Sequence, residues 1–238
     1  MTGHGRRIAA VSLTIASLGA LSGCSLFGGA GSAAGVLAGV AGGAGAGGGG
    51  AGGGGFDATS DAIIAQGPTR TPLSGQANYA GELRINTQDA SGAGNGSVTG
   101  DLALTVDFDA TDNPFSGSAS GFAGTVGGQQ VALDGQLTAQ DNTAGGVNFI
   151  ASDTVSAAGT SVTTTSFGLN LEGELTEQGT GVTSQVIAGT NNLFMGPDGQ
   201  GSAGAMRVDV TDTGGETSVL TGRSGGVGLD GAYHIERQ

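Results

Sequence analysis

Regular alternation of apolar and polar residues is the feature that most limits how this chain folds. From about Pro68 onward it recurs in short segments; in one of them Tyr79, Leu83 and Ile85 share one face while Glu82 lies on the other. A period of two is typical of antiparallel strands with one buried and one solvated face. Turn segments rich in Gly, Asp and Asn separate the strands. The alternating segments are ANYAGELRI, DLALTVDF, VALDGQL, FGLNLEGEL, GVTSQVIAG, AMRVDV and VGLDGAYHI.

The spacing of these segments predicts an all-β fold, a small antiparallel up-and-down β-barrel of about eight strands over residues 68–238. After residue 70 no segment has a convincing amphipathic-helix pattern. Glycines on the apolar faces would weaken a flat sheet, but they suit the tight coiling of a narrow barrel. We therefore expect an interior filled by side chains rather than a ligand cavity. These glycines are Gly81, Gly135, Gly173 and Gly231.

The first 23 residues have the three-part organisation of a secretory signal peptide. Arg6 and Arg7 form a basic start, the apolar run IAAVSLTIASLGA follows, and small residues come before Cys24. The apolar run is shorter than the roughly twenty residues that a membrane helix needs. The sequence therefore predicts residues 1–23 to be an export signal.

The tetrapeptide Leu21, Ser22, Gly23 and Cys24 resembles the lipobox of bacterial lipoproteins. The resemblance implies that Cys24 is acylated and becomes the first residue of the mature chain. Several acyl chains on one residue hold a protein firmly to a bilayer, at about 0.8 kcal/mol per buried methylene. Ser25, in place of an Asp, implies sorting to the outer membrane. The alternative is a free thiol, after an ordinary signal peptide or in a core.

Residues 24–67 are predicted to be a flexible Gly/Ala-rich tether that carries the lipidated cysteine. The stretch from Gly28 to Gly55 has no charge and almost no bulky side chain, so it cannot offset its ordering entropy by burial. Such a tether spans roughly 30 Å. A packed membrane helix is the alternative, because glycines recur four residues apart as in a glycine zipper. The glycines with this spacing are Gly31, Gly35, Gly39, Gly43 and Gly47.

Charge and cysteine content exclude several classes of protein. The chain has 7 basic residues, all Arg, against 20 acidic residues, and loss of the signal would remove Arg6 and Arg7. Such an acidic surface repels nucleic acid phosphates. The single cysteine leaves no disulfide framework and no thiolate metal site. We expect no nucleic acid partner, no metal and no cofactor; the expected partner is the lipid bilayer, through Cys24.

The region of residues 72–236 resembles the barrels of transferrin-binding-protein-type lipoproteins, which include transferrin-binding protein B and the factor H-binding protein. The matching pieces are G-x-A-x-Y-x-G from Gly75 to Gly81, the VDF that ends at Phe108, and GGVGLDGAYHI near the C-terminus. The resemblance implies an antiparallel barrel held on a lipid anchor. The partner-binding loops of that family have no counterpart here, so transferrin or complement binding is not implied.

Candidate catalytic and metal-binding residues are few. His234 is the only histidine outside the signal segment, and it is expected on the solvated face of the last strand. Glu172 and Glu174, on one strand face about 7 Å apart, resemble a glycosidase pair but are better explained as solubilising charges. The three acidic residues of VDFDATDNP offer calcium ligands, but such turns often cap strand ends without an ion. They are Asp107, Asp109 and Asp112.

A single GGVGLDGAY segment fits the calcium-binding toxin repeat loosely, but that motif needs stacked copies. The chain is therefore predicted to be an outer-membrane-anchored lipoprotein, not an enzyme, that displays a β-barrel for binding or envelope structure. One alternative is an integral outer-membrane barrel, against which the scarcity of aromatic residues argues. A second alternative is a lipocalin-like carrier of a small ligand.

Overall fold

The computed structural model describes residues 53–139, 148–157 and 160–238. Within these ranges, side chains are described for every residue except 53, 54, 157 and 160. All described residues belong to a single compact unit. The described elements are α2 (Gly53–Ala65), β1 (Gln76–Gln88), β2 (Gly94–Asp107), β3 (Phe115–Val126), β4 (Gln129–Ala139), β5 (Phe149–Ala157), β6 (Thr160–Glu177), β7 (Thr183–Leu193), a 3-10 turn η1 (Pro197–Gly199), β8 (Gly201–Asp212) and β9 (Gly226–Arg237).

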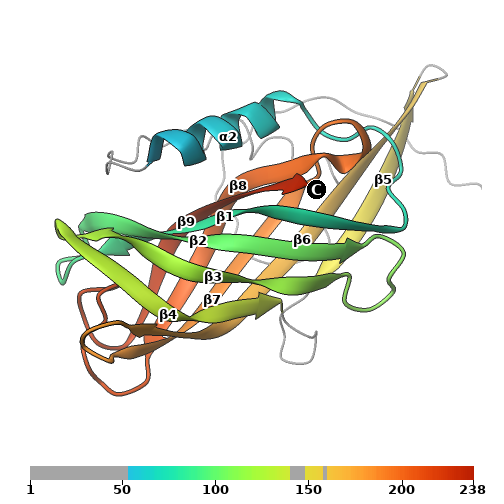
Figure 1. Ribbon diagram of the computed structural model, residues 1–238. Coiled ribbons are helices and arrows are strands. Elements are labelled where there is room, and N and C mark those ends of the chain that lie inside the picture. The colour runs from blue at the N-terminus through green and yellow to red at the C-terminus, as the bar shows by residue number, and fades with distance from the viewer. Residues whose placement is uncertain (1–52, 140–147, 158–159) are drawn as a thin grey trace, which may run out of the picture. The chain divides into compact units, whose positions relative to one another are not determined.

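Eight of the strands close into an antiparallel barrel, which confirms the predicted fold class (Figure 1). Successive strands pair with each other except β4 and β5, and β1 pairs with β9. Closure is completed where β4 pairs with the C-terminal part of β6, from Leu133 opposite Glu177 to Ala139 opposite Leu171. The extra strand is β5, which among the described strands pairs only with β6.

The sequence analysis missed two strands, β3 and β5. In β3 (FSGSASGFAGTV) glycine, serine and alanine occupy most positions, so few apolar residues mark the buried face. In β5 (FIASDTVSA) residues 151–156 are exposed on both faces, so burial imposes no apolar alternation there. Both strands are held by pairing with neighbours that have a stronger pattern.

The inward faces of the strands form one hydrophobic core, as the alternation predicted. Phe167 lies near its centre, with ring centroids 4.7 Å from Phe194 and 5.6 Å from Phe115. The two tyrosines also point inward and are hydrogen-bonded: the Tyr79 hydroxyl donates to the Gly199 carbonyl at 2.7 Å, and the Tyr233 hydroxyl lies 2.8 Å from Ser202 Oγ. Large side chains therefore occupy the interior of the barrel.

Strand glycines let neighbouring backbones approach closely, as expected for a coiled narrow barrel. A Cβ atom at Gly81 of β1 would collide with the backbone carbonyl oxygen of His234 in β9. At Gly135 of β4, φ is +115° and a Cβ would collide with the carbonyl of Glu174 in β6. A side chain at either position would force the two strands apart.

Helix α2 packs outside the barrel against β8 and β9 (Figure 1). Phe56, Ser60 and Ile63 share its inner face, because they are spaced four and three residues apart. Ile63 packs in a small cluster with Leu193, Met195 and Ala203. The helix ends before Gly67, whose φ of +72° is typical of a glycine C-cap.

The sequence analysis did not predict α2, since residues 24–67 were expected to be a flexible tether. The helix forms in the part of that segment where the pure glycine tract gives way to Ala, Ile and Phe, and Phe56 and Ile63 supply the apolar surface that the tract lacks. No helix among the described residues is long and apolar enough to span a membrane.

Candidate functional site

The lipobox predicted from the sequence, Leu21 to Cys24, lies outside the described residues, and so does the tether as far as residue 52. The candidate sites that the structure does describe lie on the outer surface of the barrel. One is a polar cluster beneath α2. The other is a depression over β7, β8 and β9.

The polar cluster centres on His234 of β9 and Glu82 of β1, which are register partners in the β1–β9 ladder. The His234 Nε2 atom lies 3.2 Å from Glu82 Oε2. The Phe56 ring of α2 meets the imidazole edge-on, with centroids 4.8 Å apart. His234 faces outward, as predicted, but the expectation of exposure is wrong: its side chain is 8% exposed, because α2 covers it.

Arg84, two residues after Glu82 on β1, ties the start of α2 to the same cluster. Its Nη2 atom lies 2.8 Å from Asp57 Oδ1, and its guanidinium carbon lies 4.3 Å from the centre of the Phe56 ring. The Asp57 carboxylate is largely exposed, so the ion pair contributes at most about 1 kcal/mol. Phe56, held between Arg84 and His234, is therefore the main anchor of this end of the helix.

Three buried polar atoms at this interface have no hydrogen-bond partner among the described residues. They are Ser60 Oγ on α2, Arg84 Nε on β1 and His234 Nδ1 on β9. Leaving a buried polar atom unsatisfied costs roughly 1–3 kcal/mol. Apolar packing by Phe56 and Ile63, rather than a complete polar network, therefore holds the helix on the barrel.

The chemistry of the cluster does not resemble a catalytic centre. The contacts described for His234 are a carboxylate and an aromatic ring, whereas nucleophilic catalysis needs a hydroxyl or thiol within hydrogen-bond reach of the imidazole. The arrangement fastens a helix and a strand together. Sequence reasoning missed it because the partner element, α2, was not predicted.

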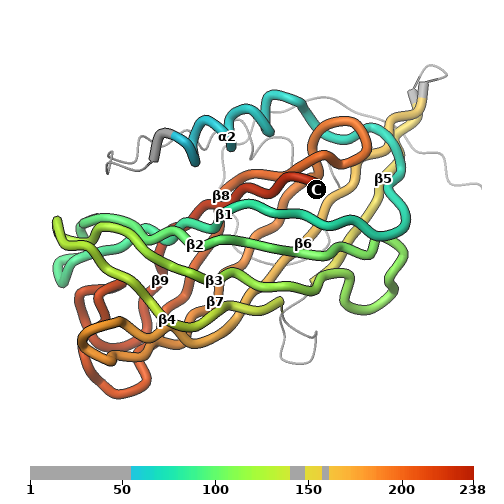
Figure 2. Tube along the Cα trace, viewed as in Figure 1, coloured from blue at the N-terminus to red at the C-terminus, as the bar shows by residue number. Residues whose placement is uncertain are grey.

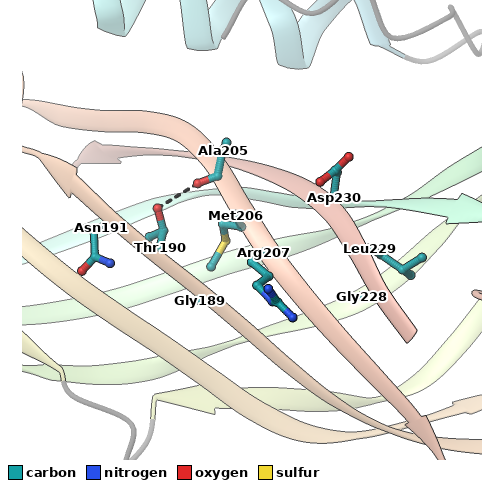
Figure 3. Close-up of a pocket in the computed structure, with 9 residues that line it drawn as sticks. All are labelled: Gly189, Thr190, Asn191, Ala205, Met206, Arg207, Gly228, Leu229 and Asp230. Atoms are coloured by element: carbon teal, nitrogen blue, oxygen red, sulfur yellow. Dashed lines mark hydrogen bonds between the residues drawn. The ribbon is translucent and has the colours of Figure 1, made fainter. Parts of the chain in front are cut away.

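The second candidate is a depression of about 600 Å³ on the outer face of β7, β8 and β9 (Figure 3). The surface is hollowed here because Gly189, Ala205 and Gly228 have small side chains or none. Thr190 closes one side by donating from Oγ1 to the Ala205 carbonyl at 2.8 Å. The lining residues are Gly189, Thr190, Asn191, Ala205, Met206, Arg207, Gly228, Leu229 and Asp230.

Arg207 at this depression already has a charged partner, Asp209. The Arg207 guanidinium donates from Nη2 to Asp209 Oδ1 at 2.9 Å, and Asp209 raises the pKa of Arg207 by this hydrogen bond and by its charge. Asp230 comes from β9, in the segment that loosely matched the toxin repeat, and it lies opposite Arg207 in the ladder. This segment is a strand and not a calcium-binding turn.

The carboxylates of VDFDATDNP, considered as calcium ligands and judged better explained as a turn, take part in local hydrogen bonds. Asp107 Oδ2 accepts from Gln76 Nε2 at 2.9 Å and Oδ1 accepts from the Asp109 amide at 3.1 Å, and these bonds lower the pKa of Asp107. Asp109 Oδ2 accepts from the Gly75 amide at 2.9 Å. Together these bonds tie the loop after β2 to the start of β1, and Asp112 follows in the same loop.

The other acidic residues named from the sequence lie on the outer face of β6. Glu172 Oε1 accepts from Gln185 Nε2 at 3.4 Å, and Glu174 is exposed. Among the described residues no group of three or more His, Cys, Asp or Glu side chains is placed to hold a metal ion.

Compared with known proteins, the chain matches no protein-family model, no curated protein and no solved structure.

Proposed function

We propose that this protein is a lipoprotein, anchored to the outer membrane through acylated Cys24, that displays a non-enzymatic β-barrel for binding or envelope structure. The observation that carries the proposal is the order of the segments: a short export signal, the tetrapeptide from Leu21 to Cys24, a glycine tract, and then a folded barrel. In this arrangement the lipid supplies the membrane affinity and the barrel supplies the surface.

The distribution of polar residues supports a barrel that stands in water. Its outer face carries charged side chains such as Asp101, Glu174 and Asp230, whereas the inward faces form the hydrophobic core. An integral outer-membrane barrel has the opposite arrangement, with an apolar outer band in contact with lipid. The polar outer face therefore favours the anchored body over the integral-barrel alternative.

The packing of the interior bears on the lipocalin-like alternative. A carrier of small ligands keeps an open cavity within the barrel. Here the ring of Phe167 contacts those of Phe194 and Phe115 within the core, and both tyrosines are buried. A filled interior favours recognition on the outer surface, where the depression over β7, β8 and β9 lies.

Metabolic labelling with radioactive palmitate tests the anchor. We expect the wild-type chain to be labelled and the Cys24→Ser variant to be unlabelled, because the lipobox cysteine is the acyl acceptor. A matched control, Cys24→Ser with Ser32→Cys, keeps one thiol but moves it away from the lipobox, and it is also expected to be unlabelled. Equal labelling of wild type and Cys24→Ser would overturn the proposal.

A second experiment tests display. Intact cells and broken cells that produce the full chain are treated with a protease, and cleavage is followed with antibodies against the barrel. Cleavage in intact cells would place the barrel at the cell surface, and cleavage only after breakage would place it on the periplasmic side. A barrel that leaves the membrane fraction without detergent would contradict the lipid anchor.

A further inference from the structure

The hairpin of β5 and β6 extends past the end of the barrel (Figure 2). Pairing of β6 with β7 begins only at Ser166, so Thr160–Thr165 pair with β5 alone among the described strands. On its other side β5 has no paired strand in the part of the chain that the structure describes. Residues 151–156 are exposed, and Val155 is 64% exposed. Within the described part of the chain the hairpin therefore presents an open strand edge.

An open edge offers backbone N–H and C=O groups to any other strand, and natural proteins usually protect such edges with Lys, Pro or a bulge. Strand β5 has little of this protection among the described residues. Its sequence, FIASDTVSA, contains no Lys and no Pro and one charged residue, Asp153, and its register with β6 runs without a shift. The edge is therefore available to pair with another strand.

The hairpin is preorganised for further pairing by a row of hydroxyl contacts on one face. Cross-strand oxygen pairs lie 2.6 to 3.1 Å apart. These contacts hold the two strands in register and keep their backbone extended. The pairs are Ser152 with Thr165, Thr154 with Thr163, and Ser156 with Ser161.

The sequence of β5 shows what would pair with it. Around Thr154 the segment ASDTVSA, residues 151–157, reads nearly the same in both directions. Two antiparallel copies related by a two-fold axis at Thr154 would place Thr154 opposite Thr154, Ser152 opposite Ser156, and Ala151 opposite Ala157. Such a contact is isologous, the commonest arrangement in homodimers. It would continue the hydroxyl row from one hairpin into the next.

Charge also permits this contact. Asp153 is the only charged residue between Phe149 and Leu169, although the whole chain has a net charge of −13. With the axis at Thr154, Asp153 faces Val155 of the other copy and not a second carboxylate. The hairpin is therefore a part of this acidic chain where two copies meet with little repulsion.

We propose that two copies of this chain associate through an antiparallel β5–β5 contact centred on Thr154, joining their hairpins into a four-stranded sheet. The ladder of residues 151–157 is short and buries less than the roughly 1,200 Å² of standard specific interfaces, so the dimer is weak in dilute solution. The inference does not rest on the lipid anchor.

Sedimentation of the full chain in mild detergent tests the association. We expect a dimer that dissociates on dilution. Thr154→Lys should be monomeric, because the axis brings two ammonium groups face to face. Thr154→Val is the matched control, since it also removes the hydroxyl bond to Thr163 but adds no charge, and it should still dimerise. Equal association of the Lys and Val variants, or a wild-type chain that stays monomeric at high concentration, would overturn the proposal.

The register is tested separately by disulfide trapping in a Cys24→Ser background. Thr154→Cys should cross-link with itself on mild oxidation. Ser152→Cys should not, because two such residues lie about 13 Å apart in this register, but it should cross-link with Ser156→Cys when the two are mixed. Ile187→Cys, on the exposed face of β7, reports random collision. Cross-linking of Thr154→Cys no faster than that of Ile187→Cys would exclude the contact, whatever the sedimentation shows.

Discussion

Glu82 and His234 face each other across the β1–β9 ladder, with the carboxylate oxygen 3.2 Å from the imidazole Nε2 and helix α2 packed over them. These residues are far apart in the sequence, and their pairing joins the first barrel strand to the last. The helix that covers them follows the glycine tract directly. Helix α2 thus lies over the ladder that joins the first strand of the barrel to the last.

Phe56 is predicted to hold α2 in place. Phe56→Ala removes the ring that lies between Arg84 and His234, and truncation of a buried Phe costs roughly 3–5 kcal/mol. We expect hydrogen exchange of the α2 amides to become fast while the strand amides remain protected. Ile64→Ala, on the 38% exposed side of the same helix, is the control and should change little. Unchanged protection of α2 in Phe56→Ala would contradict this role.

Gly81→Ala is predicted to destabilise the pairing of β1 with β9. The added methyl group meets the His234 carbonyl oxygen, so β1 and β9 must separate or bend. Overpacking of this kind usually costs about 1–3 kcal/mol, and more where rigid backbone must move. Urea unfolding followed by circular dichroism measures the loss. Gly226→Ala in β9 is the control, because its methyl group meets only Thr211 Oγ1 at 3.6 Å, an ordinary contact.

The two tyrosines are predicted to stay neutral well above pH 10. Burial raises the pKa of Tyr79 to about 12 and raises that of Tyr233 further. Below pH 10 this stabilisation is fully present. Between pH 10 and about 12 the unfolded chain loses protons that the folded chain keeps, so stability falls as pH rises. Ultraviolet absorbance of the phenolate measures the ionisation of the tyrosines, and the chain unfolded in guanidinium is the reference. Ionisation of the native protein near pH 10 would contradict the prediction.

Phe167→Ala is predicted to be among the most damaging core substitutions. The ring touches Phe194 and Phe115 and lies 6.5 Å from Tyr233, centroid to centroid. We expect a loss of about 3–5 kcal/mol in the free energy of unfolding, measured with urea, and a smaller loss for Phe167→Leu. Ile187→Ala, on the outer face of β7, should cost little. A core that tolerates Phe167→Ala without loss would indicate an interior less tightly filled than the ring contacts imply.

Much of the barrel follows from local pattern. Tyr79, Leu83 and Ile85 were assigned to the buried face from their spacing alone, and all three are buried. The glycine at position 81 was likewise expected to serve close packing, and a Cβ there has no room. These predictions succeed because successive side chains point to opposite faces of a strand, so a strand that is buried on one face has apolar residues at every second position. Strands β3 and β5 lack a clear apolar alternation and were therefore not predicted.

The sequence by itself determined the all-β class of the barrel and its inward faces, since both depend on residues close together in the chain. Only the tertiary structure decided that α2 covers His234, that the β1–β9 ladder pairs this residue with Glu82, and that β5 has no second paired strand among the described residues. Those features depend on contacts between segments distant in the chain, and alternation within one segment holds no information about which distant segment will lie against it.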